Sequence, residues 1–185
     1  LRNLMDVPCA NEQVKKAFVF SCFTGLRLSD ARTLTWRKVY KTPDGKTLYI
    51  HVFMQKTQKP NNIPLSQEAL NCLQPKEDLD EPVFTLPASD ATINYHVKKL
   101  VKAAGIEKKV SFHCSRHTFA TMMLTLGVDI YTTSKLLGHA NVTTTAIYAK
   151  IVDKKKVDAM NLVNDLFTKD DNTVNYEDRT TQPQA

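Results

Sequence analysis

Several polar side chains in the C-terminal half of the chain have the types and the order that phosphoryl transfer needs. His113, Arg116 and His117 lie close together, His139 directly follows a glycine, and Tyr148 comes shortly after. Imidazoles can hold or move protons, a guanidinium can bind two phosphate oxygens at once, and a phenol can attack phosphorus. These residues therefore predict a site for a phosphodiester.

A second arginine suited to the same chemistry, Arg27, stands far upstream in the run Thr24-Gly-Leu-Arg27-Leu-Ser-Asp30. Attack on a phosphodiester builds negative charge on the non-bridging oxygens, and positive donors must stabilise it. Planar guanidinium matches phosphate better than ammonium does, so Arg27 and Arg116 form the natural clamp. Taken alone, either arginine is more often a surface or ion-paired residue.

Two lysines, Lys56 and Lys59, lie on a predicted turn between two strands. A lysine on a flexible turn can reach into a groove and give a proton to a leaving alkoxide. Most turn lysines are simply solvated, and the pattern by itself leaves open which of the two would act.

The spacing of His113 and His117 is also compatible with a zinc site on a helix. The metalloprotease pattern requires glutamate after the first histidine, and Cys114 stands there instead. No third ligand is near in the sequence, so we expect no metal. His113 is expected just before a helix and facing the site, with His117 packing or hydrogen-bonding within that helix.

The size of the chain favours a single domain, and its charge favours a polyanionic binding partner. The 185 residues carry a formal charge of +6, and the acidic segment from residue 168 onward leaves an even more basic body. Basic bodies are typical of nucleic-acid-binding proteins, although a merely soluble basic protein is equally compatible with charge alone. No apolar run is long enough for a membrane helix, and the four cysteines show no paired spacing.

Hydrophobic periodicity predicts a mostly α-helical α+β fold with a small three-stranded antiparallel sheet. The strands are expected on either side of a turn at residues 43–46, with the second at 48–54 and a short third at 63–65, where Pro64 favours an edge position. Ser29 is the expected cap of the second helix. The helices are expected over residues 11–24, 29–34, 66–73, 90–104, 115–126, 131–137 and 143–149, with an amphipathic stripe over 157–167.

Taken together, these runs closely resemble the catalytic domain of the tyrosine recombinases, or phage-type integrases. The resemblance extends from about Asn11 to Asp153 and includes His113-x-x-Arg116-His-Thr-Phe-Ala-Thr121 and Leu136-Leu-Gly-His139. The run from Phe20 to Asp30 is most similar to integrases of Bacteroides-type mobile elements. The resemblance implies the DNA breaking-rejoining fold of that family.

The resemblance also implies a transesterification that needs no metal, ATP or other cofactor. Tyr148 would attack a DNA phosphate and form a 3′-phosphotyrosine, which stores the bond energy until a 5′-hydroxyl of a partner strand attacks it. Arg27 and Arg116 would bind the phosphate and stabilise its transition state. His139 would hydrogen-bond a non-bridging oxygen.

Three further residues receive roles from the same resemblance. His113 would assist proton transfer from the tyrosine, and Lys56, which fits the turn register better than Lys59, would protonate the leaving oxygen. Asp30 would orient its neighbours. Ser115 stands where the family usually has an apolar residue. Additional contacts to DNA are expected from Lys59, Thr57, Lys38 and Ser115.

The expected domain organisation follows the family. Residues 1–167 would form the catalytic domain, with a C-terminal helix at 153–167 that docks on its own core or on a neighbouring protomer. Residues 168–185 would be a disordered acidic tail, and a separate N-terminal DNA-binding domain would be missing. The expected setting is double-stranded DNA in the bacterial cytoplasm, in the nucleoid, bound by a homotetramer with accessory DNA-bending proteins and no membrane.

Three alternatives compete with this interpretation. The segment from Leu126 to Thr144 superficially resembles a helix-turn-helix regulator, which would need neither Arg27 nor Tyr148. An inactive recombinase relative is a second alternative, but all six catalytic positions carry the expected residue types. A type IB topoisomerase shares the chemistry and would relax DNA without exchanging partners.

Overall fold

The computed structural model describes residues 1–148, 157 and 159–163. It confirms a mostly helical α+β fold with one three-stranded antiparallel sheet. In chain order the elements are α1 (Arg2–Asp6), α2 (Glu12–Thr24), α3 (Leu28–Arg32), the 3-10 helix η1 (Trp36–Lys38), β1 (Val39–Lys41), β2 (Leu48–Met54), β3 (Lys59–Pro64), α4 (Gln67–Leu70), α5 (Asp90–Ala103), α6 (Cys114–Thr125), α7 (Ile130–Leu136) and the 3-10 helix η2 (Val142–Tyr148).

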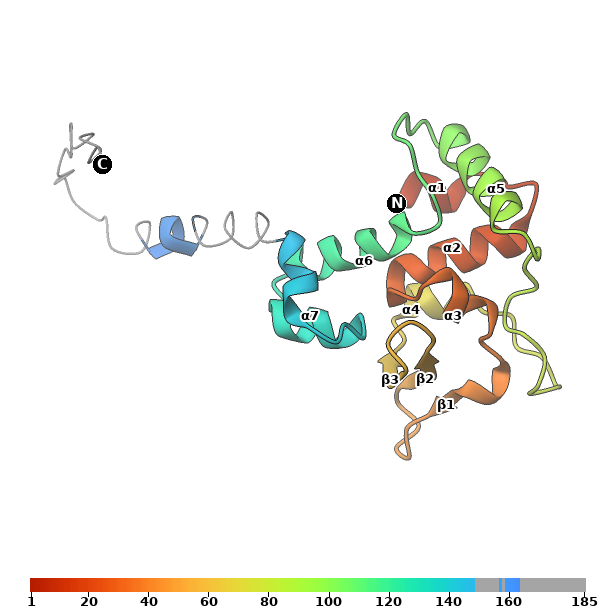
Figure 1. The fold of residues 1–185 in the computed structure, drawn as a ribbon, viewed down its shortest axis with the longest axis horizontal. Helices are drawn as coiled ribbons and strands as arrows, with labels where there is room; N and C mark the ends of the chain where they lie inside the picture. Colours follow the sequence, from red (N-terminus) through yellow and green to blue (C-terminus); the bar gives the residue numbers. More distant parts are fainter. Residues whose placement is uncertain (149–156, 158, 164–185) are drawn as a thin grey trace, which may run out of the picture.

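Helix α2 is the element around which the body is built, and it contacts α4, α5 and α6 (Figure 1). It begins as predicted at Asn11, whose side chain accepts a hydrogen bond from the Val14 N–H at 3.0 Å. It ends at Gly25, which has a φ of 72° and donates its N–H to the Ser21 carbonyl. The left-handed conformation costs glycine little, so the chain can turn sharply toward Arg27.

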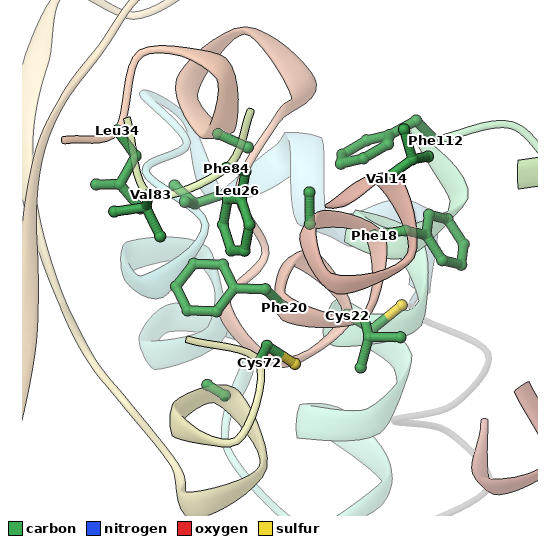
Figure 2. Close-up of a cluster of buried hydrophobic side chains, with 14 of the residues drawn as sticks. Val14, Phe18, Phe20, Cys22, Leu26, Leu34, Cys72, Val83, Phe84 and Phe112 are labelled. Atoms are coloured by element: carbon green, nitrogen blue, oxygen red, sulfur yellow. The ribbon is translucent and has the colours of Figure 1, made fainter. Parts of the chain in front are cut away.

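Aromatic side chains fill the core beneath α2 (Figure 2). The Phe20 and Phe84 rings lie 5.2 Å apart, and Phe18 meets Phe112 edge to face at 5.7 Å. Burying each such ring stabilises the fold by roughly 1.5–3 kcal/mol. Because Phe112 precedes His113, this packing also fixes where α6 begins.

The sheet has the order β1-β2-β3, with β2 in the centre. Along β2, the buried Ile50 and Val52 alternate with the exposed His51 and Phe53, as expected for a strand with one covered face. Pro64 lies on the edge strand β3, as predicted.

The third strand is longer than the sequence predicted. It begins at Lys59, which pairs with Met54, so only residues 55–58 form the turn. Pro60 and the two asparagines after it suggested a continuing loop, because these residue types are rare in strands. Pairing with β2 overrides that local preference.

Two helical expectations also need correction, and one helix was not expected. Helix α3 begins at Leu28 with Arg27 at its N-cap position, so Ser29 lies inside the helix and does not cap it. Helix α4 ends at Leu70, earlier than predicted, although Ser66 caps it as expected. The sequence reading did not anticipate α1, a short helix that buries Leu4 against the core.

Beyond the body, α6 leads to α7 and η2, which pack around a second and smaller hydrophobic cluster (Figure 1). Its buried members are Phe119, Ala120 and Leu137. Residues 157 and 159–163 are helical and exposed. The rest of the predicted C-terminal helix at 153–167 and the whole acidic tail lie outside the described residues. Among the described residues, none of the helices has the length and apolar character needed to span a membrane.

Candidate active site

Arg27 and Asp30 face each other at the start of α3. The Arg27 Nη1 atom lies 3.9 Å from the Asp30 Oδ2 atom, and Asp30 is almost fully buried. The other carboxylate oxygen of Asp30 accepts the Gln55 N–H at 3.1 Å. Asp30 therefore ties the arginine to the turn that carries Lys56.

The Arg27 guanidinium keeps an open donor. Its Nη1 atom is buried and hydrogen-bonds no other group in the described part of the chain. Burial lowers the pKa of Arg27, and the Asp30 carboxylate opposes that shift. A buried donor without a partner is costly, so an anion bound here would satisfy it.

Arg116 is held between two chain turns. Its side chain is only 4% exposed, and its guanidinium donates to the Gly25 carbonyl at 2.6 Å and to the Leu137 carbonyl at 2.5 Å. Burial, followed by repulsion from Arg27, lowers the pKa of Arg116 to about 9, so the guanidinium is charged at neutral pH. A guanidinium has five N–H donors, so several stay available for phosphate oxygens.

His139 follows Gly138, whose φ of 63° turns the chain at the end of α7. The His139 Nδ1 atom lies 2.9 Å from the hydroxyl of the buried Thr145. Burial lowers the pKa of His139 to about 4, and so do the positive charges of Arg116, Arg27 and Lys56. When Nδ1 accepts from Thr145, the neutral ring carries its proton on Nε2 and can donate to a phosphate oxygen.

His113 lies at the N-cap position of α6, just before the helix, as predicted. The preceding Phe112 N–H donates to the Asn94 side chain of α5 at 2.8 Å, which anchors this junction to the body. Burial lowers the pKa of His113 first, and its interactions with His117, Arg116, Arg27 and Lys56 lower it further, in that order.

The hairpin turn distinguishes the two lysines. Lys56 lies in the turn, exposed, and its charge lowers the pKa of both His113 and His139. Lys59 is the first residue of β3, also exposed, and no such influence on either histidine is found. These charge interactions favour Lys56 as the lysine of the proposed site.

Tyr148 ends η2 and is half-buried, and its hydroxyl contacts a histidine. The Tyr148 Oη atom lies 2.5 Å from the His117 Nδ1 atom. His117 is exposed and does not pack within its own helix, so the expectation for this residue is corrected. Its ring also meets the His113 ring edge to face at 4.8 Å. Burial raises the pKa of Tyr148, and the positive charge of Arg116 opposes the shift.

The residues expected to touch DNA differ in their burial and hydrogen bonding. The prediction for Ser115 is wrong, because this side chain is fully buried on the core face of α6 and donates to the Phe112 carbonyl at 2.7 Å. Lys38 is half-buried, and its ammonium donates to the Thr33 carbonyl at 2.8 Å. The Thr57 hydroxyl is buried without a hydrogen-bond partner among the described residues.

Sequence reasoning missed two asparagines that position the site. Asn94 anchors the junction before His113, and Asn61 of β3 donates its side-chain amide to the Leu136 carbonyl at 2.9 Å. The two last-turn carbonyls of α7, at Leu136 and Leu137, are thus satisfied by side chains from β3 and α6. The sequence offered no signal for Asn61, because it was expected in the turn before the third strand, where asparagine is common.

No three side chains of the metal-binding types His, Cys, Asp and Glu gather as ligands in the part of the chain that the structure describes. The four cysteines are free thiols. The functional groups that do gather are two guanidinium groups, a lysine, three imidazoles and a phenol. They suit charge stabilisation and proton transfer at a phosphate.

Comparisons with known proteins identify the family of the chain. The model of the Phage integrase family matches residues 1–155. A tyrosine recombinase of Thermosipho africanus is 32% identical over 152 residues, which cover 79% of this chain and 52% of the relative. The chain spans about half the length of the curated relatives it matches, at 52% and 57% of two of them.

Solved structures show the same fold. The catalytic domain of bacteriophage HP1 integrase aligns with a TM-score of 0.60 and 25% identity, over 81% of this chain and 82% of that one. The XerH site-specific recombinase, in a complex with its difH substrate, aligns with a TM-score of 0.63 and 18% identity, over 80% of this chain and 46% of that one. The chain therefore belongs to the phage integrase family of tyrosine recombinases.

Proposed function

We propose that this chain is the catalytic part of a site-specific DNA recombinase or integrase, which cuts and rejoins DNA through a 3′-phosphotyrosine. One observation carries the proposal. The buried Nη1 atom of Arg27 has no hydrogen-bond partner among the described residues, beside a site where burial first, and then the charges of Arg116, Arg27 and Lys56, lower the pKa of His139 to about 4. A phosphodiester would satisfy that donor and fits the forked donors of the two arginines.

The chemistry uses Tyr148 as the nucleophile. Its hydroxyl loses a proton, its oxygen bonds to phosphorus, and the bond from phosphorus to the 5′-oxygen breaks. Lys56 gives a proton to that leaving oxygen. Arg27, Arg116 and His139 hold the non-bridging oxygens, on which charge develops during the attack.

The reverse of the same step rejoins DNA. A 5′-hydroxyl attacks the phosphotyrosine, and the phenol is released. Because the covalent intermediate conserves the energy of the phosphodiester, the cycle requires neither ATP nor a metal ion. Asp30 acts through position, since it connects Arg27 with the backbone of the turn that carries Lys56.

The wider assignment rests on the family and on the sequence pattern. Double-stranded DNA is the proposed partner, and the co-structure of XerH with difH supports it. We place residues 1–167 in the catalytic domain, with DNA clamping by a further N-terminal domain. Synapsis as a homotetramer, accessory DNA-bending proteins and a setting in the bacterial cytoplasm complete the proposal. The run from Phe20 to Asp30 favours integrases of Bacteroides-type mobile elements.

A covalent-adduct assay tests the proposal. The substrate is a nicked duplex that carries the end of the genetic element encoding the protein, and the buffer contains EDTA. We expect an SDS-resistant protein–DNA adduct from the wild type and none from Tyr148→Phe. If the longest natural chain containing these residues gives no adduct, or if Tyr148→Phe still gives one, the proposed mechanism is wrong.

A further inference from the structure

We propose that His117, rather than His113, is the group that receives the proton of Tyr148 during DNA cleavage. This inference rests on the proposed function and deepens it by adding a catalytic residue. His117 touches the reacting atom itself, because its Nδ1 lies 2.5 Å from the Tyr148 hydroxyl oxygen.

Contacts distinguish the two histidines. The imidazole of His113 contacts His117 edge to face at 4.8 Å, and within the described residues it makes no hydrogen bond to Tyr148. Both histidines are exposed, so the difference between them lies in their contacts: only His117 hydrogen-bonds the phenol among the described residues. A proton taken up by the exposed His117 can pass on to water.

Helix geometry explains why one short run supplies two different functions. Adjacent residues on a helix project about 100° apart, whereas residues four apart share a face. Arg116 therefore points into the core, toward the Gly25 and Leu137 carbonyls, while His117 points outward to η2. Helix α6 thus holds the phosphate with one side chain and the nucleophile with the next.

The nucleophile needs such a base. A phenol is mostly protonated at neutral pH, and burial raises the pKa of Tyr148 further. In the proposed step the Tyr148 proton moves to His117 Nδ1 as the oxygen bonds to phosphorus. The bond from phosphorus to the 5′-oxygen then breaks, and that oxygen takes a proton from Lys56. On rejoining, each proton returns to the group that gave it.

His113 suits a different duty. Burial and the positive charges around it lower its pKa, so its ring is neutral at physiological pH. A neutral ring beside His117 allows the second ring to become an imidazolium without repulsion between two cations. We therefore propose that His113 is a neutral neighbour that lets His117 take up a proton, and not the base itself.

The decisive variant is His117→Asn. The asparagine side chain places an amide atom where Nδ1 lies, so it can still hydrogen-bond the phenol but cannot accept its proton. We expect adduct formation to slow about 10²–10⁴-fold, the usual contribution of general base catalysis. Noncovalent binding of the nicked duplex should be unchanged. His51→Asn, on the exposed face of β2, is the matched control and should cleave at the wild-type rate.

Chemical rescue separates the base from the leaving-group acid. Replacing Tyr148 with a trifluorotyrosine lowers the phenol pKa, so the penalty of His117→Asn should shrink at least about 10-fold. A substrate with sulfur in place of the bridging 5′-oxygen needs no proton on its leaving group. With that substrate, Lys56→Ala should cleave at a restored rate, whereas cleavage by His117→Asn should stay slow.

Two results would overturn the inference while leaving the proposed function intact. One is His117→Asn with wild-type cleavage, which would reduce the contact to a positioning role. The other is that the fluorinated tyrosine relieves the slow adduct formation of His113→Asn but not that of His117→Asn. Absence of any adduct from the wild type would instead contradict the proposed function.

A measurement without DNA tests the contact itself. In NMR spectra of the protein, Tyr148→Phe should move the imidazole signals of His117 and leave those of His51 in place. Unchanged His117 signals would show that the hydrogen bond is not formed in solution, and the inference would fail whatever the activity of the protein.

Discussion

The body around α2 and the region of α6, α7 and η2 contribute to the same site but are packed very differently. The body has a large continuous core that includes Phe20 and Phe84, whereas the hydrophobic cluster of the second region has three buried members among the described residues, Phe119, Ala120 and Leu137. Arg27, Asp30 and Lys56 belong to the body, and His139 and Tyr148 belong to the small cluster.

The difference indicates a division of tasks. A large core fixes side chains closely, while a small cluster opens at lower free energy. Arg27, the proposed phosphate-binding arginine, is thus on the rigid part, and Tyr148, the proposed nucleophile, is on the part that can adjust. Arg116 joins the two regions, because its guanidinium bonds the Gly25 carbonyl of one and the Leu137 carbonyl of the other.

The largest expected effect comes from removing one aromatic ring from each region. Phe20→Ala should lower the free energy of unfolding by about 4–5 kcal/mol, and Phe119→Ala by about 3 kcal/mol, because a small cluster can collapse more easily into the cavity. Urea unfolding of both variants measures this. Cleavage, measured while both variants are folded, should fall more for Phe119→Ala. An opposite order in cleavage would break the proposed division.

Replacing each arginine with lysine comes next. Both Arg116→Lys and Arg27→Lys should slow adduct formation about 10²-fold or more, since lysine cannot fork two phosphate oxygens. Only Arg116→Lys should also lower the free energy of unfolding, by roughly 1–3 kcal/mol, because a buried carbonyl loses its partner. Equal stability of the two variants would show that Arg116 does not join the regions.

The turn at Gly25 offers a smaller and well-controlled test. A Cβ atom there would lie 2.7 Å from Phe119 Cδ1 and 2.9 Å from Leu137 Cδ2, so Gly25→Ala forces the two regions apart. We expect a loss of roughly 2–3 kcal/mol in unfolding free energy.

The control for that test is Gly105→Ala. Gly105 has the same φ of 72°, but a Cβ atom there would meet nothing within 4 Å. Its substitution should cost only about 1 kcal/mol, the price of the left-handed backbone alone. Equal losses in the two variants, measured by urea unfolding, would argue against close contact between the regions at Gly25.

The smallest expected effect is a pH dependence of stability. The pKa of His139 is lowered to about 4 in the folded protein from 6.5, so the unfolded chain takes up the proton first as the pH falls. The stabilisation is complete above pH 6.5 and is lost between about 6.5 and 4, by roughly 1 kcal/mol after allowance for solvent screening of this partly exposed ring.

Urea unfolding at pH 7 and pH 5 tests this prediction. We expect His139→Gln to reduce the difference in the free energy of unfolding between the two pH values. His113 has a pKa shifted in the same direction and adds to the effect. His51→Gln is the control and should keep the wild-type difference. A wild-type protein that is more stable at pH 5 would contradict the sign.

Much of the fold could be predicted because its signals are local. Asn11 and Gly25 mark the two ends of α2, and the alternation along β2 marks its buried face. The start of β3 was missed, because pairing with β2 outweighed residues that locally favour a turn. Ser29 as a cap was wrong for a similar reason, since Arg27 took the N-cap position at the turn after α2.

The sequence by itself determined the residue types of the site, their order and the family, because guanidinium, imidazole and phenol groups in that order are specific to one chemistry. Only the tertiary structure decided which groups touch. It buried Ser115, placed Lys56 near both His113 and His139, and joined Tyr148 to His117. The reason is that contacts between distant segments depend on how helices pack, and packing is set by the whole core rather than by neighbours in the chain.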